Sequence, residues 1–323
     1  MNKTMKHFFL TLGLALCSFL LVPKIAEASS ISLGIYPPII QVDTTPPASI
    51  SAPLEIHNLG DDSVQLKIIL KPFKASDSEN GQLTYLKDNE SFGDDPLFLQ
   101  RVKIFDDQDL IDSLDLAPKQ VKKLTLNIEI PSDEPPSDYY FSVIFVSKTQ
   151  LETDLNASQN AGGIGTNVLV SIGPKGTTKG AVKEFSAPFW LENGPVPFTV
   201  RIANESKHFI NPKGEIMIKN MFGQTIGRVD LLPVNILSGT VRAIPSAAGG
   251  KKPIIDSQAA LWPEELLIGP YAATLTLSLS EQGPILKKTI HFIGFPIQII
   301  LGVIVVAVIL LLIRNKVRKQ LLE

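Results

Sequence analysis

Cysteine is almost absent from this sequence: Cys17 is the only one among 323 residues. It lies in an apolar run, residues 8–22, which follows a basic start and precedes the small-x-small pattern Ala26-Glu27-Ala28 that signal peptidases accept. Residues 1–28 are therefore predicted to be a signal peptide, and the mature chain has no cysteine. Lipid attachment at Cys17 is disfavoured because Leu16 stands where a small residue is needed. Exported eukaryotic chains of this size normally use disulfides, so their absence favours a bacterial protein.

Histidine is also scarce. His57, His208 and His291 remain after the signal is removed, and none lies beside a Gly-x-Ser-x-Gly turn or at metal-ligand spacing from another. We interpret them as solvated or partly buried polar residues. No opposed pair of carboxylates can be identified for glycosidase chemistry either. The prediction is that the protein is not an enzyme.

One acidic stretch superficially resembles a calcium-binding loop. It runs through residues 77–81, and a regular loop would place Glu at its twelfth position, where this chain has Asp88 with its shorter side chain. A solvated turn with Asn80 and Gly81 at its tip is the preferred interpretation. No metal or other cofactor is predicted, and calcium dependence is left open.

Positive charge is in deficit between the predicted signal and the C-terminal tail. There, 23 Lys and Arg face 30 Asp and Glu, which gives a net charge of about −7. A negative surface repels phosphate backbones and anionic lipid headgroups. The sequence therefore predicts no nucleic-acid partner.

Charge disappears altogether near the C-terminus, from residue 292 to residue 313. A transmembrane helix is predicted over 293–313, since residues 297–313 alone would span about 25 Å at ~1.5 Å per residue. The tail 314–323 carries the bases of a predicted cytoplasmic membrane anchor: Arg314, Lys316, Arg318 and Lys319. The predicted localisation is the cell membrane, single-pass, with the ectodomain outside (extracellular or periplasmic) and the C-terminus cytoplasmic.

Between the two apolar ends helical periodicity is lacking. Apolar and polar residues alternate instead, as in 64–70, 124–130 and 273–279, and many of the 24 prolines stand at the borders of such segments. Period two indicates antiparallel sheets with one buried face. The predicted fold class is all-β: two immunoglobulin-like β-sandwich domains in tandem, 29–175 and 176–292, followed by the single C-terminal transmembrane helix.

Two features recur in both halves. An alternating strand ends at Asn58 in the first half and at Asn204 in the second, where the amide is predicted to bond its own following backbone. Tyr139 and Tyr271 each enter a late strand and are predicted to be structural tyrosine corners. The domain boundary is expected within the breaker-rich residues 173–180.

Several short motifs together resemble a known family. They are Ile35-Tyr36-Pro37-Pro38-Ile39, Asn80-Gly81-Gln82-Leu83-Thr84-Tyr85, Asp138-Tyr139-Tyr140-Phe141, Val200-Arg201-Ile202-Ala203-Asn204, Gly214-Glu215-Ile216-Met217-Ile218 and Ile268-Gly269-Pro270-Tyr271. In this order they resemble the bacterial WxL-interacting proteins, which have two immunoglobulin-like domains and a C-terminal membrane anchor. The resemblance implies peptidoglycan or wall-polymer binding by the first domain and a cell-surface protein partner for the second. None of the family's ligand-binding residues can be placed here, so they stay unknown.

The predicted function is a non-catalytic, membrane-anchored cell-envelope binding or adhesion protein, whose unpaired sandwich edges could accept a partner strand. One alternative is a periplasmic pilus-type chaperone or assembly factor, which also uses two immunoglobulin-like domains. The other is an envelope enzyme. Trp190 and Trp262 could stack on wall sugars, but packing roles are preferred. Ligand identity, binding face and oligomeric state are left open.

Overall fold

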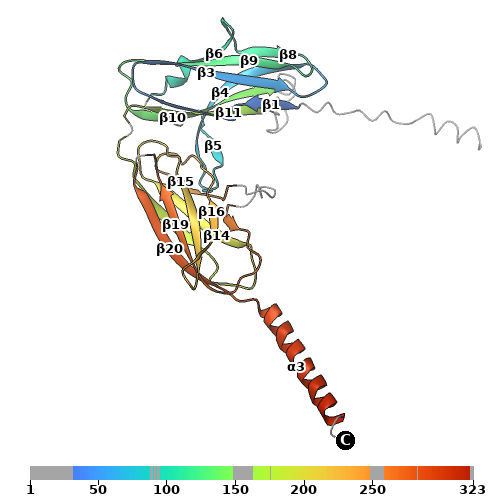
Figure 1. The fold of residues 1–323 in the computed structure, drawn as a ribbon. Coiled ribbons are helices and arrows are strands. Elements are labelled where there is room, and N and C mark those ends of the chain that lie inside the picture. Colours follow the sequence, from blue (N-terminus) through green and yellow to red (C-terminus); the bar gives the residue numbers. More distant parts are fainter. Residues whose placement is uncertain are drawn as a thin grey trace, which may run out of the picture.

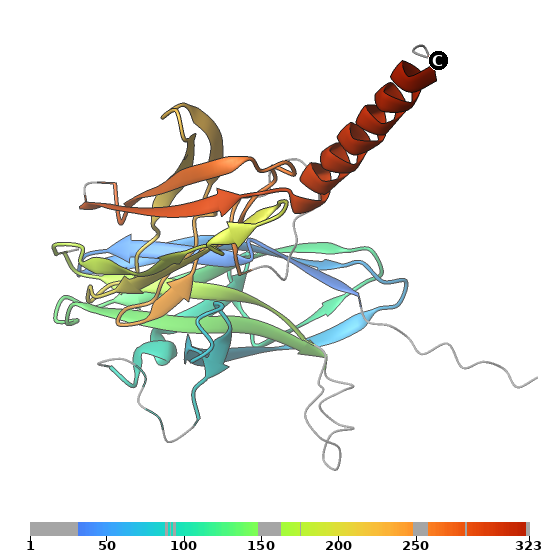
Figure 2. The same cartoon turned by 90° about the horizontal axis from the view of Figure 1, so that it is seen from below.

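The structure is a computed structural model that describes residues 32–87, 90, 92, 95–147, 163–174, 176–247, 258–281 and 283–320. The predicted signal peptide, residues 1–28, and Asp88, the twelfth position of the stretch that resembles a calcium-binding loop, lie outside these residues. Two β-sandwiches follow one another along the chain, and a helix extends from the second (Figure 1). Seen from below, the helix projects away from the sheets (Figure 2).

The first sandwich has two sheets. One has the order β1 (Leu33–Tyr36), β3 (Ala48–Asn58), β9 (Val121–Ile130), β6 (Val102–Asp106) and β7 (Asp109–Leu110). The other has the order β2 (Ile39–Thr44), β11 (Gly163–Ile172), β10 (Ser137–Ser147), β4 (Val64–Ala75) and β5 (Leu83–Tyr85), with β8 (Ser113–Leu116) also on β4. A short 3-10 helix, η1 (Phe98–Arg101), precedes β6. Within this sandwich the described strand pairs are antiparallel except β2 with β11, which is parallel.

The second sandwich is built in the same way. Its smaller sheet contains β12 (Gly180–Ser186), β14 (Val196–Asn204), β17 (Val241–Ala243) and β18 (Ala260–Trp262). Its larger sheet has the order β13 (Trp190–Leu191), β20 (Ile285–Gly294), β19 (Gly269–Ser278), β15 (Lys213–Asn220) and β16 (Thr225–Asp230). The chain is thus mostly β with sandwich domains, as predicted.

Each sandwich has its own hydrophobic core. In β9 the inward residues Leu124, Leu126 and Ile128 are buried while their neighbours face solvent, and β4 and β19 alternate similarly. Each such side chain contributes about 1.5–3 kcal/mol by leaving water. In the second core Trp262 lies edge-on to Tyr271 at 5.8 Å, which confirms a packing role for this tryptophan. Trp190 is half exposed and lies edge-on to Phe295.

The C-terminal helix corrects one prediction. α3 (Ile297–Gln320) begins later than the predicted span 293–313, because residues 293 and 294 belong to β20. Its uncharged part runs from Ile297 to Ile313, and Arg314 follows. In the part of the chain that the structure describes, no helix is long and apolar enough to span a membrane. The predicted transmembrane helix and single-pass localisation with a cytoplasmic C-terminus are therefore wrong.

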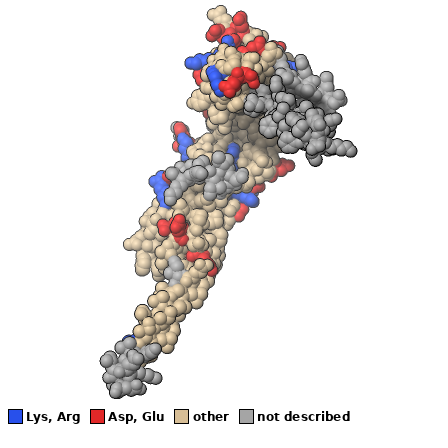
Figure 3. All heavy atoms as spheres, turned by 90° about the vertical axis from the view of Figure 1, so that its right-hand side faces the viewer, with Lys and Arg blue, Asp and Glu red and all other residues tan. Residues whose placement is uncertain are grey.

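Of the predicted anchor residues, Arg314 is exposed on α3, and Lys316, Arg318 and Lys319 lie in its last turns. The side chains of the last three are outside the described residues. On the face turned to the viewer, Figure 3 shows almost only uncharged residues along α3.

Candidate functional site

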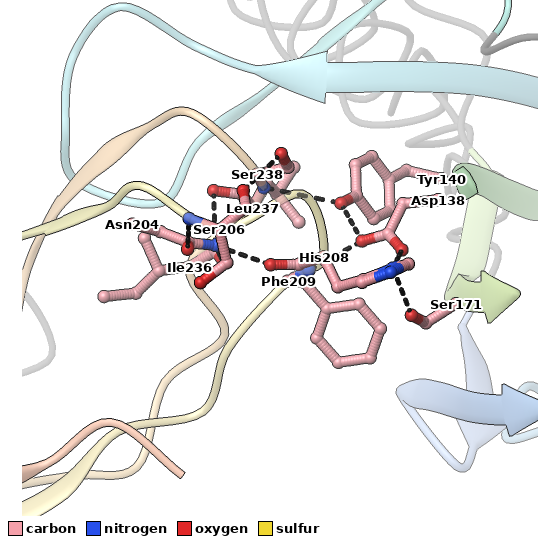
Figure 4. Close-up of polar contacts among 10 residues, drawn as sticks. All are labelled: Asp138, Tyr140, Ser171, Asn204, Ser206, His208, Phe209, Ile236, Leu237 and Ser238. Carbon is pink, nitrogen blue, oxygen red and sulfur yellow. Dashed lines mark hydrogen bonds and ion pairs between the residues drawn. The ribbon is translucent and has the colours of Figure 1, made fainter. Parts of the chain in front are cut away.

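The two sandwiches meet through a loop that Asn204 organises. Asn204 ends β14 and is 1% exposed. Its Nδ2 donates to the carbonyls of His208 at 2.9 Å, Ile236 at 2.9 Å and Leu237 at 3.2 Å, and its Oδ1 accepts the Ser206 N–H at 2.9 Å. The last bond is the one predicted from the sequence. These bonds fix residues 205–211 at the end of the sandwich that faces the first domain (Figure 4).

Asn58 has the corresponding place in the first sandwich. Its Oδ1 accepts the Gly60 N–H at 3.0 Å, and its Nδ2 donates to the carbonyls of Asp62 at 2.8 Å and Ala117 at 3.0 Å. Both recurring asparagines therefore end a strand and tie the following turn to a distant loop. The predicted local bond is confirmed in each, while the distant partners could not be read from the strand pattern.

Asp138, at the start of β10, forms the polar centre of the joint between the domains. Its side chain is 4% exposed, and its Oδ1 lies 2.7 Å from His208 Nδ1. Its Oδ2 accepts the backbone N–H of Phe209 at 2.6 Å and the hydroxyl of Tyr140 at 2.5 Å. Figure 4 shows the carboxylate and Tyr140 on the first domain directed toward the His208 loop of the second. The carboxylate thus links the two domains through both of its oxygens.

A serine completes the group without making it a catalytic triad. Ser171 Oγ lies 2.8 Å from His208 Nδ1, the same nitrogen that faces Asp138. A triad needs the nucleophile on one ring nitrogen and the orienting carboxylate on the other. Ser171 is also 1% exposed, so no substrate carbonyl can reach it. These three side chains therefore join the domains and do not perform nucleophilic catalysis.

Apolar side chains surround this polar centre. Phe73 and Leu169, from the outer face of the second sheet of the first sandwich, pack with Phe209 and Leu237 of the second sandwich, and all four are buried. Tyr140 lies between them, stacked on Phe73 at 6.2 Å and edge-on to Phe209 at 6.4 Å. Because this small core excludes water, the hydrogen bonds of Asp138 are shielded from competition by solvent.

Burial, followed by the negative charge of Asp138, raises the pKa of Tyr140 well above its usual value. Because the pKa of Tyr140 is higher in the folded than in the unfolded chain, its neutral hydroxyl stabilises the folded state fully below pH of about 10. This stabilisation is lost as the pH rises further. We therefore expect the free energy of unfolding to fall between pH of about 9 and about 11. In Tyr140→Phe this fall should be smaller, as measured by urea unfolding at both pH values. The exposed Tyr36, changed to Phe, is the control, and an unchanged slope in Tyr140→Phe would contradict the assignment.

A cavity of about 350 Å³ lies beside the joint, between the domains. Its first-domain wall includes Ile39 and Gln41 of β2, and its second-domain wall includes Asn235 and Arg242. The lining mixes aliphatic side chains with neutral amides, the acidic Glu79 and Arg242, whose Nη1 donates to the Asn235 carbonyl at 2.6 Å. Burial lowers the pKa of Arg242. Sequence reasoning missed this site, because its walls come from segments that are far apart in the chain.

One sheet edge beside this cavity is open. β11 pairs with β10 from Gly163 to Ile172, but β2 covers its other side only from Asn167 onward. The Asn167 N–H donates to the Pro38 carbonyl, so the backbone groups of Gly163 and Gly165 point to the same side. β1 lies near this part of β11 but pairs with β3 of the other sheet, and no strand among the described residues pairs with β11 there. β2 in turn is the edge strand of this sheet.

The two predicted tyrosine corners are buried but differ in their bonds. The Tyr271 hydroxyl accepts the backbone N–H of Ile268 at 2.8 Å, three residues upstream. The Tyr139 hydroxyl instead donates to the Glu134 carboxylate at 2.6 Å, and the second oxygen of Glu134 accepts from Arg101 at 2.7 Å. Burial and then this hydrogen bond raise the pKa of Tyr139. Both tyrosines are therefore packing residues with satisfied hydroxyls.

The other sequence candidates are not brought together. His57 lies 3.5 Å from Glu55, and His291 is exposed on β20. His208, interpreted above as solvated or partly buried, is instead buried in the joint. In the described ranges no three acidic or histidine side chains gather as metal ligands, and Asp88 lies outside those ranges. The pairing of His208 with Asp138 had no signal in the sequence, since 70 positions separate them.

The chain matches no protein-family model, and no curated protein matches it. Among solved structures it is similar to the class 5 fimbriae chaperone CfaA, with 10% identity and a TM-score of 0.37 over 82% of this chain and 100% of that one. It is also similar to the E. coli chaperone DraB (10%, 0.34, 80% and 96%) and to the chaperone YadV (9%, 0.31, 80% and 99%). With TM-scores below 0.5 these likenesses are remote. No comparison tests the resemblance to WxL-interacting proteins, which stays a prediction.

Proposed function

We propose that this chain is a non-catalytic assembly factor of the pilus-chaperone type, which holds a protein partner by pairing one of the partner's strands with an open sheet edge. The observation that carries the proposal is that two stretches of one sheet lack a pairing strand among the described residues: Gly163–Thr166 of β11, and the outer side of the edge strand β2. Outward-pointing amide and carbonyl groups offer a ready set of main-chain hydrogen bonds to an extended segment.

The joint between the domains supports the same function. A partner strand on this edge would lie beside the second domain, whose loops Asp138 and the small apolar core hold in place. A fixed angle between two sandwiches presents a preformed surface, which lowers the entropy lost on binding. The Ser171–His208–Asp138 arrangement supports a binding role over an enzymatic one.

Replacement of Gly165 by proline tests the edge. The outward N–H of Gly165 would be lost and the ring would obstruct an added strand, whereas the bonds of β11 to β10 involve the residues on either side. Peptides selected on the purified full chain from a random phage-displayed library serve as the probe. We expect Gly165→Pro to weaken their binding about tenfold, as the loss of about 1–1.5 kcal/mol predicts.

Gly176→Pro is the matched control, because nothing lies within 4 Å of a side chain added there. Amide hydrogen exchange provides the second readout: bound peptide should slow exchange at Gly163 and Gly165. Circular dichroism must show that both variants keep their β structure. Peptides that bind Gly165→Pro and Gly176→Pro equally, or that protect a different strand, would remove the proposal.

Wall-polymer binding by the first domain, implied by the WxL-interacting resemblance, is the competing proposal. Sedimentation of the purified chain with isolated cell-wall sacculi tests it directly. Co-sedimentation that Gly165→Pro does not alter would support wall binding through a surface other than the open edge.

A further inference from the structure

Arg242 lies in the wall of the cavity between the domains and has no carboxylate partner among the described residues. Its Nη1 donates to the Asn235 carbonyl at 2.6 Å. No carboxylate of the described residues lies within ion-pair distance of it. The acidic residue in the same lining, Glu79, forms an ion pair with Arg201, whose Nε lies 3.3 Å from Glu79 Oε2; this buried oxygen has no hydrogen-bond partner among the described residues.

A guanidinium that is partly withdrawn from water without a counter-charge destabilises the protein that contains it. Burial alone lowers the pKa of Arg242, and the group still stays charged because the pKa of arginine is so high. An anion that enters the cavity and pairs with the guanidinium would offset this free-energy cost. The planar guanidinium matches a carboxylate with two parallel hydrogen bonds.

The rest of the lining fits a small acidic group at the end of a short apolar stem. Neutral amides that can donate to a carboxylate are contributed by both domains: Gln41, Gln82, Asn167, Asn211 and Asn235. Part of this capacity is already used, since Asn211 Nδ2 donates to Asn235 Oδ1 at 2.8 Å. Aliphatic side chains such as Leu169 and Val234 line the remainder. A volume of about 350 Å³ holds one side chain and no folded element.

The cavity adjoins the sheet edge to which a partner strand is proposed to add. Ile39 and Gln41 belong to β2 and also line the cavity, so their side chains mark the face of the sheet on which it lies. A strand paired with β2 would place every second side chain on this face, with its Cβ about 4.5–5.5 Å from its β2 neighbour. Because the free edge of β2 continues past Gln41 to Thr44, the strand would pass the cavity and not end in it.

We propose that the cavity receives an acidic side chain, Asp or Glu, of the strand that pairs with β2, and that its carboxylate pairs with Arg242. This inference rests on the proposed function and adds a rule of specificity to it. Main-chain pairing at the edge accepts many sequences, while the cavity selects those with an acid at one position. A basic side chain at that position would be rejected by Arg242.

The test uses peptides selected on the full chain, remade with each Asp or Glu changed to its amide. One substitution is expected to weaken binding to the unaltered protein about tenfold. The same substitution should not weaken binding to the Arg242→Gln variant, because the carboxylate of the original peptide has no partner there. Arg228→Gln is the matched control, since Arg228 is exposed on β16 and pairs with Glu215 at 2.7 Å and Asp230 at 2.8 Å.

Two further arms keep this test separate from that of the proposed function. Peptides with an amidated C-terminus should bind unchanged; a loss on amidation would overturn the side-chain assignment in favour of a chain end. Blocked glutamate (N-acetyl, N-methylamide) should shift the NMR signal of Arg242 Nε–H, while blocked glutamine should not, whether or not a strand pairs. Peptides that bind the edge without a preference for an acidic residue would support the proposed function and contradict this inference. The absence of any NMR shift with blocked glutamate would also contradict this inference.

Discussion

Asn204→Ala is expected to lower the free energy of unfolding of the second sandwich by about 3 kcal/mol. The substitution removes a buried amide that serves three carbonyls and one N–H, and it leaves these groups inside the protein without their partner. An unsatisfied buried polar group costs about 1–3 kcal/mol, and the carbonyls recover part of this through other contacts. Urea unfolding followed by tryptophan fluorescence measures the effect, because Trp262 lies in the second core.

Asn220→Ala is the matched control for this prediction. Asn220 also ends a strand and bonds the following turn, through Phe222 N–H at 3.0 Å and Gln224 N–H at 3.1 Å, but these groups are exposed. Water replaces such bonds, so a loss below about 1 kcal/mol is expected. Equal losses in both variants would show that the distant carbonyls bonded by Asn204 do not stabilise the domain.

Asp138→Ala is expected to release the two domains from each other at a cost of about 3–5 kcal/mol to their association. The substitution leaves His208, the Phe209 N–H and the Tyr140 hydroxyl without their common acceptor in a place that water does not reach. Each sandwich keeps its own core and should stay folded. Distances between spin labels on the two domains should therefore broaden, while circular dichroism stays the same.

Asp115→Ala serves as the control, because Asp115 is exposed on β8. Asp138→Asn supplies an intermediate case: it keeps one acceptor oxygen but loses the charge, so part of the fixed geometry should return. If the distance distribution of Asp138→Ala stayed as narrow as that of Asp115→Ala, the apolar cluster around Phe209 alone would hold the joint.

Much of the β architecture could be predicted from local pattern. Alternation in residues 64–70, 124–130 and 273–279 corresponds to β4, β9 and β19, because a half-buried sheet requires one apolar face wherever the strand lies in the fold. The local bonds of Asn58 and Asn204 were predictable for a similar reason: donor and acceptor are two residues apart.

The predicted transmembrane helix over residues 293–313 was based on hydropathy alone, and its start does not agree with the secondary structure. Residues 293 and 294 counted toward an apolar run, yet they complete β20 by pairing with Pro270 and Gly269. Apolar composition alone does not distinguish the end of a buried strand from the start of a helix.

The residue pattern of this chain was enough to specify alternating strands, their terminal asparagines and the inward-facing tyrosines, because each depends on contacts between neighbours in the chain or on the choice of buried face. The Asp138–His208 bond, the cavity at Arg242 and the open edge of β11 depended on how the sheets and domains pack. These features join segments tens of residues apart, and their strength comes from exclusion of water, a property that no short stretch of sequence possesses.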